Sequence, residues 1–397
     1  MILRLSPLFL LLALPSLSAA QGTRARDLGI PLEGTPGPLN AITDVRGVEV
    51  GMTTLVTGSG RLVRGQGPVR TGVTAILPRG SEDTHAVPAA WFTLNGNGEM
   101  TGTTWVEESG FLGGPVMITN THSVGIVHDA VIQWVVQRGR TFDWSLPVVA
   151  ETWDGWLNDI NGFHITRAHA LAALDAATGG PVAEGNVGGG TGMICHQFKG
   201  GTGTASRRIT ILREAYTVGV LVQCNYGGRG RFAVAGVPVG QEIGDLLPCY
   251  EALPGGEYAG EPRCGTPGRE REEQGSIIVV IATDVPLLPH QLKRVVRRAA
   301  LGIGRMGGIG GNSSGDIFVA FSTANRDADR ADSLAAWQAI PNERINPVFE
   351  ATIDATSEAI LNAMLAAKTM TGADGRTVYA LPHDRLIAAL RKYGRMR

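Results

Sequence analysis

The chain has 397 residues, of which 43% are hydrophobic and 18% charged, and its formal net charge is −1. Its length exceeds the roughly 100–200 residues of an average domain, but no long linker divides it, so one large α/β domain is possible. Because no basic stripe or acidic tail occurs, the composition argues against nucleic acid as a partner. The 55 glycines cluster between apolar runs, which indicates tight turns and close backbone approaches.

Residues 1–20 have the pattern of an export signal. Arg4 supplies a positive charge, residues 8–14 form a short apolar run, and small residues at 18–20 precede Gln21, as at a signal-peptidase site. The apolar run is too short to span a bilayer. We therefore expect a signal peptide that is removed, and a periplasmic or secreted protein with no membrane contact afterwards.

The four cysteines are Cys195, Cys224, Cys249 and Cys264, and they fit an oxidising compartment. No Cys-x-x-Cys motif occurs, which argues against zinc or thioredoxin-like chemistry. Of the three possible pairings, Cys249–Cys264 is the most economical, because it would close a loop just upstream of residue 276. Such a loop contributes about 3 kcal/mol if it is unstrained. Unpaired buried thiols are the alternative.

Apolar runs and periodic patterns predict strands and helices along the whole chain. Strands are expected at 71–77, 90–94, 116–119, 276–282 and 317–323, and a hairpin at 206–212 and 215–223. Helices are expected at 129–138, 166–177, 289–301, 346–368 and 384–392. Helices that flank several long strands predict a layered α/β sandwich.

Glycine-rich polar stretches separate these elements at 95–102, 184–193, 199–204 and 302–311. Loops of this kind between buried strands commonly line a site, although plain turns have the same composition. Glycine loops can also hold phosphate. Phosphate binding is disfavoured here, because no Gly-x-x-x-x-Gly-Lys-Ser/Thr motif occurs. Nor does a convincing strand–glycine loop–helix unit with an acidic ribose ligand.

Ser276 lies where the most loop-like stretch of the chain, residues 237–275, meets the apolar run that ends at Ala282. Such a run, rich in β-branched residues, predicts a strand buried on both faces. A serine at its mouth is held rigidly and can still be reached from outside. That position suits a nucleophile, and it suits a new N-terminus made by cutting Gly275–Ser276 in an exposed loop. The plain alternative is a loop ending without processing.

Seven segments of the chain, in order, carry a resemblance to a known family. They are 40–45, 151–155, 185–193, 275–280, 289–294, 312–318 and 320–325. The chain resembles the DmpA-type aminopeptidases, which include L-aminopeptidase D-amidase/D-esterases and β-peptidyl aminopeptidases. The resemblance covers roughly residues 38–395, and ordered matches over that length are far more specific than any one glycine loop.

The resemblance implies a four-layer αββα sandwich, related to the N-terminal-nucleophile hydrolases but connected differently. It also implies self-cleavage at Gly275–Ser276 into an α chain (21–275) and a β chain (276–397). Ser276 would then carry the nucleophilic hydroxyl and a free α-amine. An α-amine with a pKa of about 8 can serve as the base near neutral pH. The resemblance implies no metal or organic cofactor, and a homo-oligomer of αβ units.

Individual roles also follow from the resemblance. Ser314 falls at the position of a second serine that acts as a relay partner of the nucleophile, and Asp316 at an acidic position that orients this network or meets the substrate amine. Asn225 matches an asparagine that stabilises the oxyanion. Glu151 matches an acidic residue near the free amino terminus of the substrate. Without the resemblance, Ser314 and Asp316 would read as capping residues of a turn before a strand.

Three departures from the family pattern stand out. Trp153 stands where some members have a Tyr whose hydroxyl lies in the oxyanion region, and an indole N–H can donate but not accept. Met52 stands where a His is expected. The segment 249–275 is enlarged, which would alter access to the pocket or an oligomer interface.

The sequence thus predicts an exported, self-processing serine aminopeptidase. It would release N-terminal residues from short peptides, amides or esters through an acyl-enzyme on Ser276. One alternative is an acyltransferase on a related fold, which would pass the acyl group to an amine. The other is a non-catalytic periplasmic protein that holds a ligand with its glycine loops, which the intact set of site residues argues against.

Overall fold

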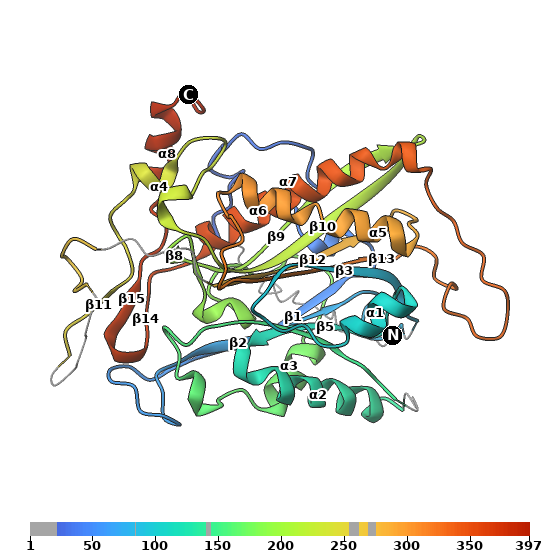
Figure 1. Ribbon diagram of the computed structural model, residues 1–397, viewed down its shortest axis with the longest axis horizontal. Coiled ribbons are helices and arrows are strands. Elements are labelled where there is room, and N and C mark those ends of the chain that lie inside the picture. Colours follow the sequence, from blue (N-terminus) through green and yellow to red (C-terminus); the bar gives the residue numbers. More distant parts are fainter. Residues whose placement is uncertain (1–21, 84, 140–143, 254–261, 269–274) are drawn as a thin grey trace, which may run out of the picture.

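The computed structural model describes residues 22–83, 85–139, 144–253, 262–268 and 275–397. Two β-sheets pack face to face in the middle of the molecule, and helices cover the outer face of each (Figure 1). The layers run α, β, β, α, which confirms the expected four-layer sandwich. The predicted signal peptide, 1–20, lies outside the described residues.

The smaller sheet has four strands in the order β1-β2-β5-β6. These strands are β1 (Glu49–Thr57), β2 (Val69–Leu77), β5 (Val116–Asn120) and β6 (Val148–Thr152). β5 and β6 run parallel, and the other neighbours are antiparallel. Helices α2 (Val124–Gln137) and α3 (Arg167–Asp175) pack their apolar side chains on its outer face.

The larger sheet has six strands in the order β4-β3-β13-β12-β10-β9. They are β4 (Phe111–Leu112), β3 (Val87–Gly96), β13 (Gly315–Ser322), β12 (Ser276–Thr283), β10 (Glu214–Asn225) and β9 (Gly201–Ile211). Only β12 and β13 run parallel within it. Its outer face carries α5 (Pro289–Val296), α6 (Ala299–Arg305) and α7 (Asn346–Ala366).

Strand β12 lies at the centre of both cores, as its apolar sequence predicts. Ile277 and Val279 join the cluster under α5, α6 and α7, whereas Ile278 and Val280 join the cluster between the two sheets. Side chains alternate between the faces of a strand, so both faces of β12 are apolar because both are covered. Ser276, two residues before Ile278, belongs to the face that looks toward the smaller sheet.

Shorter elements complete the fold. The helices are α1 (Thr103–Ser109), α4 (Val239–Glu242) and α8 (His383–Lys392), and the strands are β7 (Ile194–Cys195), β8 (Phe198–Lys199), β11 (Cys249–Tyr250), β14 (Met370–Thr371) and β15 (Arg376–Val378). The 3-10 helices are η1 (Ile42–Asp44), η2 (Thr121–Ser123), η3 (Ile160–Gly162), η4 (Gly188–Gly192), η5 (Arg229–Arg231), η6 (Asn342–Arg344) and η7 (Ala373–Gly375). Among the described residues, no helix is long and apolar enough to cross a membrane.

Two expectations about helices are corrected. The expected helix at 289–301 is two helices, α5 and α6, and α6 extends into the stretch 302–311 that we expected to be a loop. The split falls at the turn residues Arg297 and Arg298. Helix α6 continues through Gly302, where a Cβ would lie 2.8 Å from Cβ of Thr356, so this glycine permits a close approach to α7. Helix α2 begins at Val124 rather than 129, after a turn in which Asn120 Oδ1 accepts the His122 N–H (3.1 Å).

The expected glycine loop at 199–204 is wrong, because Lys199 ends strand β8 and residues 201–204 belong to strand β9, with only Gly200 between the two strands. Gly203 serves packing: a Cβ there would lie 2.6 Å from the backbone nitrogen of Ala363 on α7. Lys199 is fully buried, which removes it as a phosphate ligand. The predicted hairpin is confirmed as β9 and β10.

The stretch 237–275 contains more regular structure than expected, namely α4 and β11. Residues 254–261 and 269–274 lie outside the described residues. The four cysteines form two disulfides. Cys249 pairs with Cys264 (Cα–Cα 5.0 Å) and Cys195 with Cys224 (Cα–Cα 5.6 Å). The pairing Cys249–Cys264 is therefore confirmed, and no free cysteine occurs in the described chain.

Candidate active site

Ser276 is the first residue of β12, and its neighbours are set by strand pairing. It lies opposite Asn225 at the end of antiparallel β10 and beside Gly315 at the start of parallel β13. The Gly315 backbone N–H donates a hydrogen bond to Ser276 Oγ (3.1 Å). Ser276 is only 5% exposed. The hydroxyl is thus held at the end of the sandwich, in the space between the sheets.

Gly275 has a conformation that other residues rarely adopt. Its φ is +106°, and a Cβ there would collide with the Asn225 carbonyl oxygen. Glycine alone combines left-handed backbone with so close an approach. The geometry of the Gly275–Ser276 bond therefore depends on the absence of a side chain at 275.

If the Gly275–Ser276 bond is cut, as the resemblance implies, Gly275→Ala is expected to slow the cut at least about tenfold, because holding Ala in the present backbone geometry of this bond costs about 1–3 kcal/mol and the collision adds to that cost. Intact mass recorded over time after synthesis measures the cut. Gly265→Ala is the matched control, since Gly265 is also left-handed (φ +84°) but has open space around the Cβ position. Equal cleavage rates in the two variants would contradict the prediction.

The Asn225 side chain is fixed at both ends. Its Oδ1 accepts the Ile194 backbone N–H (2.8 Å), and its Nδ2 donates to the Trp153 carbonyl oxygen (2.9 Å). A Cβ placed on Gly275 would lie 3.4 Å from Nδ2, so the amide is next to the Gly275–Ser276 bond. A preorganised amide N–H in this place can stabilise negative charge on a carbonyl oxygen.

Ser314 and Asp316 form a buried pair beside Ser276. Ser314 Oγ donates to Asp316 Oδ1 (2.6 Å), and the same carboxylate oxygen accepts the Ile277 N–H from the neighbouring strand (3.2 Å). The Asp316 N–H in turn donates to Asn95 Oδ1 (2.9 Å). The pairing of β13 with β3 shifts register directly after Asp316, and such bulges redirect side chains near active sites. The carboxylate therefore bridges β13 and β12 as well as orienting Ser314.

Glu151 on β6 reaches the same region from the smaller sheet. Its carboxylate accepts hydrogen bonds from Thr121 Oγ1 and from the Glu99 backbone N–H (3.0 Å for the latter). A Cβ on Gly98 would lie 3.2 Å from Glu151 Oε1 and 3.2 Å from the Cα of Gly315, so only the width of Gly98 separates this carboxylate from the residue that bonds Ser276. Burial raises the pKa of Glu151, and these two hydrogen bonds oppose the rise.

If Glu151 binds the substrate amine, as the resemblance implies, Glu151→Gln should raise KM about 10- to 100-fold for substrates with a free amine, because a charged hydrogen bond is lost. In the wild type, KM should also rise as pH falls through the raised pKa of Glu151, since a protonated carboxyl cannot pair with an ammonium ion. The variant should lack this acid dependence. Steady-state kinetics across pH test both statements, with the exposed Glu108→Gln as control. A variant with wild-type KM would contradict the assignment.

Trp153 and Met52 mark the two single-residue departures from the family pattern. The contact between Trp153 and Asn225 uses the Trp153 backbone carbonyl, while its half-exposed ring packs over Gly155, where a Cβ would lie 2.7 Å from ring atoms. Met52 is a partly buried side chain at the margin of the core between the sheets, next to Gly188. Met52 thus packs as an apolar residue.

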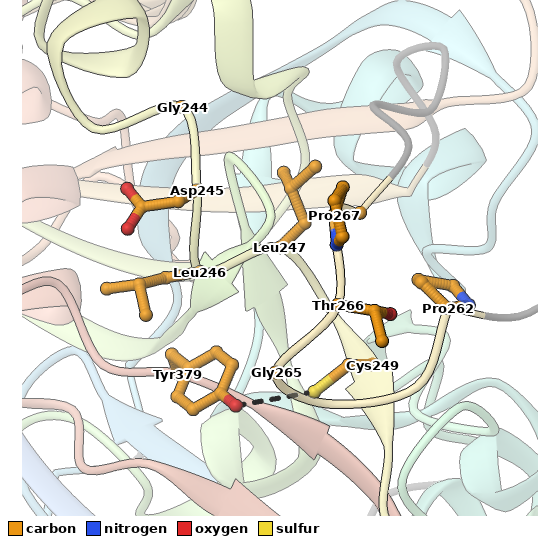
Figure 2. A pocket seen from close by; sticks show the side chains of 11 residues that line it. Gly244, Asp245, Leu246, Leu247, Cys249, Pro262, Gly265, Thr266, Pro267 and Tyr379 are labelled. Carbon is orange, nitrogen blue, oxygen red and sulfur yellow. Dashed lines mark hydrogen bonds between the residues drawn. The ribbon is translucent and has the colours of Figure 1, made fainter.

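A cavity of about 550 Å³ is separate from this constellation. Figure 2 shows its walls: the segment 244–247 after α4, Cys249, the segment 262–268 and Tyr379, whose hydroxyl lies 3.6 Å from Cys249 Sγ. None of the predicted site residues lines it. Residues 249, 262 and 265–268 of the segment 249–275 therefore form one wall of this cavity.

Several contacts of the site were not predicted from the sequence. They are the Gly315 N–H on Ser276, the Ile194 N–H on Asn225 and the Asn95 side chain beside Asp316. Asn95 does begin the glycine-rich stretch that we considered as a site loop. The two backbone N–H groups cannot be predicted from the residue type, because every residue except proline can supply an N–H.

Comparison with known proteins gives the family. The profile of peptidase family S58 matches residues 40–378. The chain therefore belongs to peptidase family S58. A beta-peptidyl aminopeptidase, BapA of Sphingosinicella microcystinivorans, is 56% identical over 382 residues, which are 96% of this chain and 94% of the relative.

Two solved structures share the S58 fold. The L-aminopeptidase D-Ala-esterase/amidase from Ochrobactrum anthropi, described as a prototype of the serine aminopeptidases and a variant of the Ntn hydrolase fold, aligns with a TM-score of 0.84 at 49% identity, covering 94% of this chain and 99% of that one. A Burkholderia sp. beta-aminopeptidase aligns at 0.81 and 44% identity, covering 94% and 99%. This S58 chain is accordingly a serine-type aminopeptidase of the N-terminal-nucleophile hydrolase type.

Proposed function

We propose that this S58 aminopeptidase is exported, cuts itself between Gly275 and Ser276, and uses Ser276 to release N-terminal residues from short peptides, amides or esters. The observation that carries the proposal is the meeting of Ser276 Oγ, the Asn225 amide and the left-handed Gly275 at one bond. The hydroxyl would supply the nucleophile, the neighbouring amide would stabilise the oxyanion, and the glycine gives the backbone its unusual geometry.

Maturation would begin with attack of Ser276 Oγ on the Gly275 carbonyl carbon. The C–O bond forms, the Gly275–Ser276 C–N bond breaks, and the hydroxyl proton moves to the departing nitrogen, which becomes the α-amine of Ser276. Water then hydrolyses the resulting ester and frees the Gly275 carboxylate. The Asn225 N–H would stabilise the tetrahedral oxyanion of each step.

Turnover would repeat this chemistry on a substrate. The α-amine of Ser276, an amine with a pKa of about 8 when unperturbed, takes the proton of Oγ as the latter attacks the substrate carbonyl. The amine or alcohol leaving group takes that proton, and water releases the acyl group. Ser314, held by Asp316, would relay or orient protons at Oγ.

Exopeptidase specificity would come from Glu151. Its buried carboxylate can pair with the ammonium group of the first residue, while the following carbonyl meets Ser276. The names of the BapA relative and the Burkholderia enzyme support β-amino acid residues as part of the substrate range. Paired p-nitroanilides of one α- and one β-amino acid, compared by kcat/KM, measure that preference.

Export is supported by the pattern of residues 1–20 and by two disulfides, which persist in oxidising compartments. Fractionation of cells that produce the full chain tests it: the protein should appear outside the cytoplasm, starting near Gln21. We also propose a homo-oligomer of αβ units, which light scattering of the purified protein tests directly.

The deciding experiment is the intact mass of the purified protein under denaturing and reducing conditions, with N-terminal sequencing. Two chains are expected, one of which begins at Ser276. Mass spectrometry after treatment with an acylating reagent should place the label on the Ser276 chain. One uncut, unlabelled chain would overturn the proposal. Transfer of the acyl group to an added amine in preference to water would instead favour the acyltransferase.

A further inference from the structure

One peptide group connects the proposed oxyanion site to a buried lysine. The peptide between Met193 and Ile194 donates its N–H to Asn225 Oδ1 (2.8 Å). The carbonyl of the same peptide accepts a hydrogen bond from Lys199 Nζ (2.6 Å). Lys199 Nζ also donates to the Gly200 carbonyl (2.8 Å). An ammonium group, a peptide and the Asn225 amide therefore form one continuous chain of hydrogen bonds.

A tight hairpin holds the lysine in this place. β7 and β8 pair so that Lys199 lies directly opposite Ile194. The two residues between the strands, His196 and Gln197, both have positive φ (48° and 59°), as in a two-residue hairpin turn. Neither is a glycine, so the turn holds two residues in a conformation that costs each of them free energy. The hairpin thus fixes the start of the lysine side chain, and the Met193 and Gly200 carbonyls hold its Nζ.

The lysine is costly where it lies. Lys199 is fully buried, and among the described residues no carboxylate lies within ion-pair distance of Nζ. Burial lowers the pKa of its ammonium group to about 7, with no contribution from a charged neighbour. Burial of a charge is expensive unless it is well bonded, and a neutral side chain would fill the same volume without that cost.

We propose that Lys199 is a positioning residue for the oxyanion site, acting on the Asn225 amide through the Met193–Ile194 peptide. The Lys199 Nζ donor on the Met193 carbonyl polarises the peptide, most strongly while the amine is protonated, and so makes the Ile194 N–H a stronger donor. That bond in turn polarises the Asn225 amide and strengthens its N–H groups as donors, since hydrogen bonds in a chain reinforce one another. The inference rests on the proposed oxyanion role of Asn225.

Lys199→Met is expected to lower kcat about tenfold with KM changed less than about twofold, because the effect is on the transition state rather than on substrate binding. Lys199→Arg, which keeps the charge, should recover most of the loss. Arg70→Met is the matched control: Arg70 is also buried and donates to the carbonyls of Thr57 and Thr371. It should lower thermal stability and leave kcat of the folded enzyme unchanged.

A double-mutant cycle with Asn225→Ala decides whether Lys199 acts through Asn225. In the Asn225→Ala background, Lys199→Met should change the rate less than about twofold. A variant that is cut too slowly yields too little mature enzyme for a kcat measurement. For such a variant the rate of self-cleavage, followed by intact mass, is used in the double-mutant cycle instead. If Lys199→Met does not fold, Lys199→Arg replaces it, and its smaller loss should likewise vanish in the Asn225→Ala background.

Equal losses from Lys199→Met in both backgrounds would overturn the inference and leave a purely structural lysine, while the role of Asn225 would stand. No loss in the wild-type background would overturn it as well. If Asn225→Ala itself has wild-type rates, the oxyanion role of Asn225 has failed, and the inference falls with it.

Discussion

A Ser276→Ala variant is expected to remain one uncut chain and to lose hydrolysis at least about 10⁴-fold, because removal of a serine nucleophile eliminates the covalent pathway. Two properties would be lost together, since the same hydroxyl would attack Gly275 during maturation and the substrate afterwards. The fold should survive, because the change removes one oxygen that accepts only the Gly315 N–H among its described hydrogen bonds.

Two further variants make the Ser276 test specific. Ser276→Cys keeps a nucleophile and should still be cut, whereas Ser313→Ala changes an exposed serine close to the site and should behave as wild type. Intact mass, thermal melting and turnover of a p-nitroanilide provide the three readouts. Cleavage or turnover near the wild-type level in Ser276→Ala would remove Ser276 as the nucleophile.

Asn225→Ala is expected to lower kcat about 10²- to 10³-fold, which corresponds to roughly 2.7–4 kcal/mol for the loss of one oxyanion donor. KM should change little, because the interaction develops in the transition state. Self-cleavage should slow as well, since the Asn225 amide lies beside Gly275. Single-turnover kinetics of the cut enzyme and the time course of intact mass measure the two effects.

Asn225→Asp distinguishes loss of the amide N–H from loss of side-chain volume, because Asp has nearly the same size as Asn. The carboxylate accepts but cannot donate, and its charge would oppose the developing oxyanion, so the loss should be at least as large as for Asn225→Ala. Asn186→Ala is a suitable control, because the Asn186 amide bonds the backbone of Lys368 outside the site. If Asn225→Asp kept normal kcat, Asn225 would have no oxyanion role.

Elements whose burial pattern is local could be predicted along the chain. The run from Ser276 to Ala282 could be assigned to a strand covered on both faces, and the β9–β10 hairpin could be expected from two neighbouring runs. Helix α7 was indicated by Asn346 and Pro347, which are typical of a helix start. From physical patterns alone, Ser276 could be either a nucleophile or the plain end of a loop. The ordered resemblance to a known family added the αββα sandwich and the candidate residues, which spacing could not supply.

The contacts between residues far apart in the chain could not be predicted and became known from the fold. The Gly98 contact that brings Glu151 to Gly315, the pair Cys195–Cys224 and the bonds from Lys199 to Asn225 through one peptide all depend on which strands lie side by side. The close approach of α6 to α7 at Gly302 depends on the fold in the same way. Burial and periodicity are properties of a local run of residues and can be read along the chain. Hydrogen bonds between backbone groups of distant segments, and the close contacts that glycine permits between them, form only when the sheets have paired and stacked.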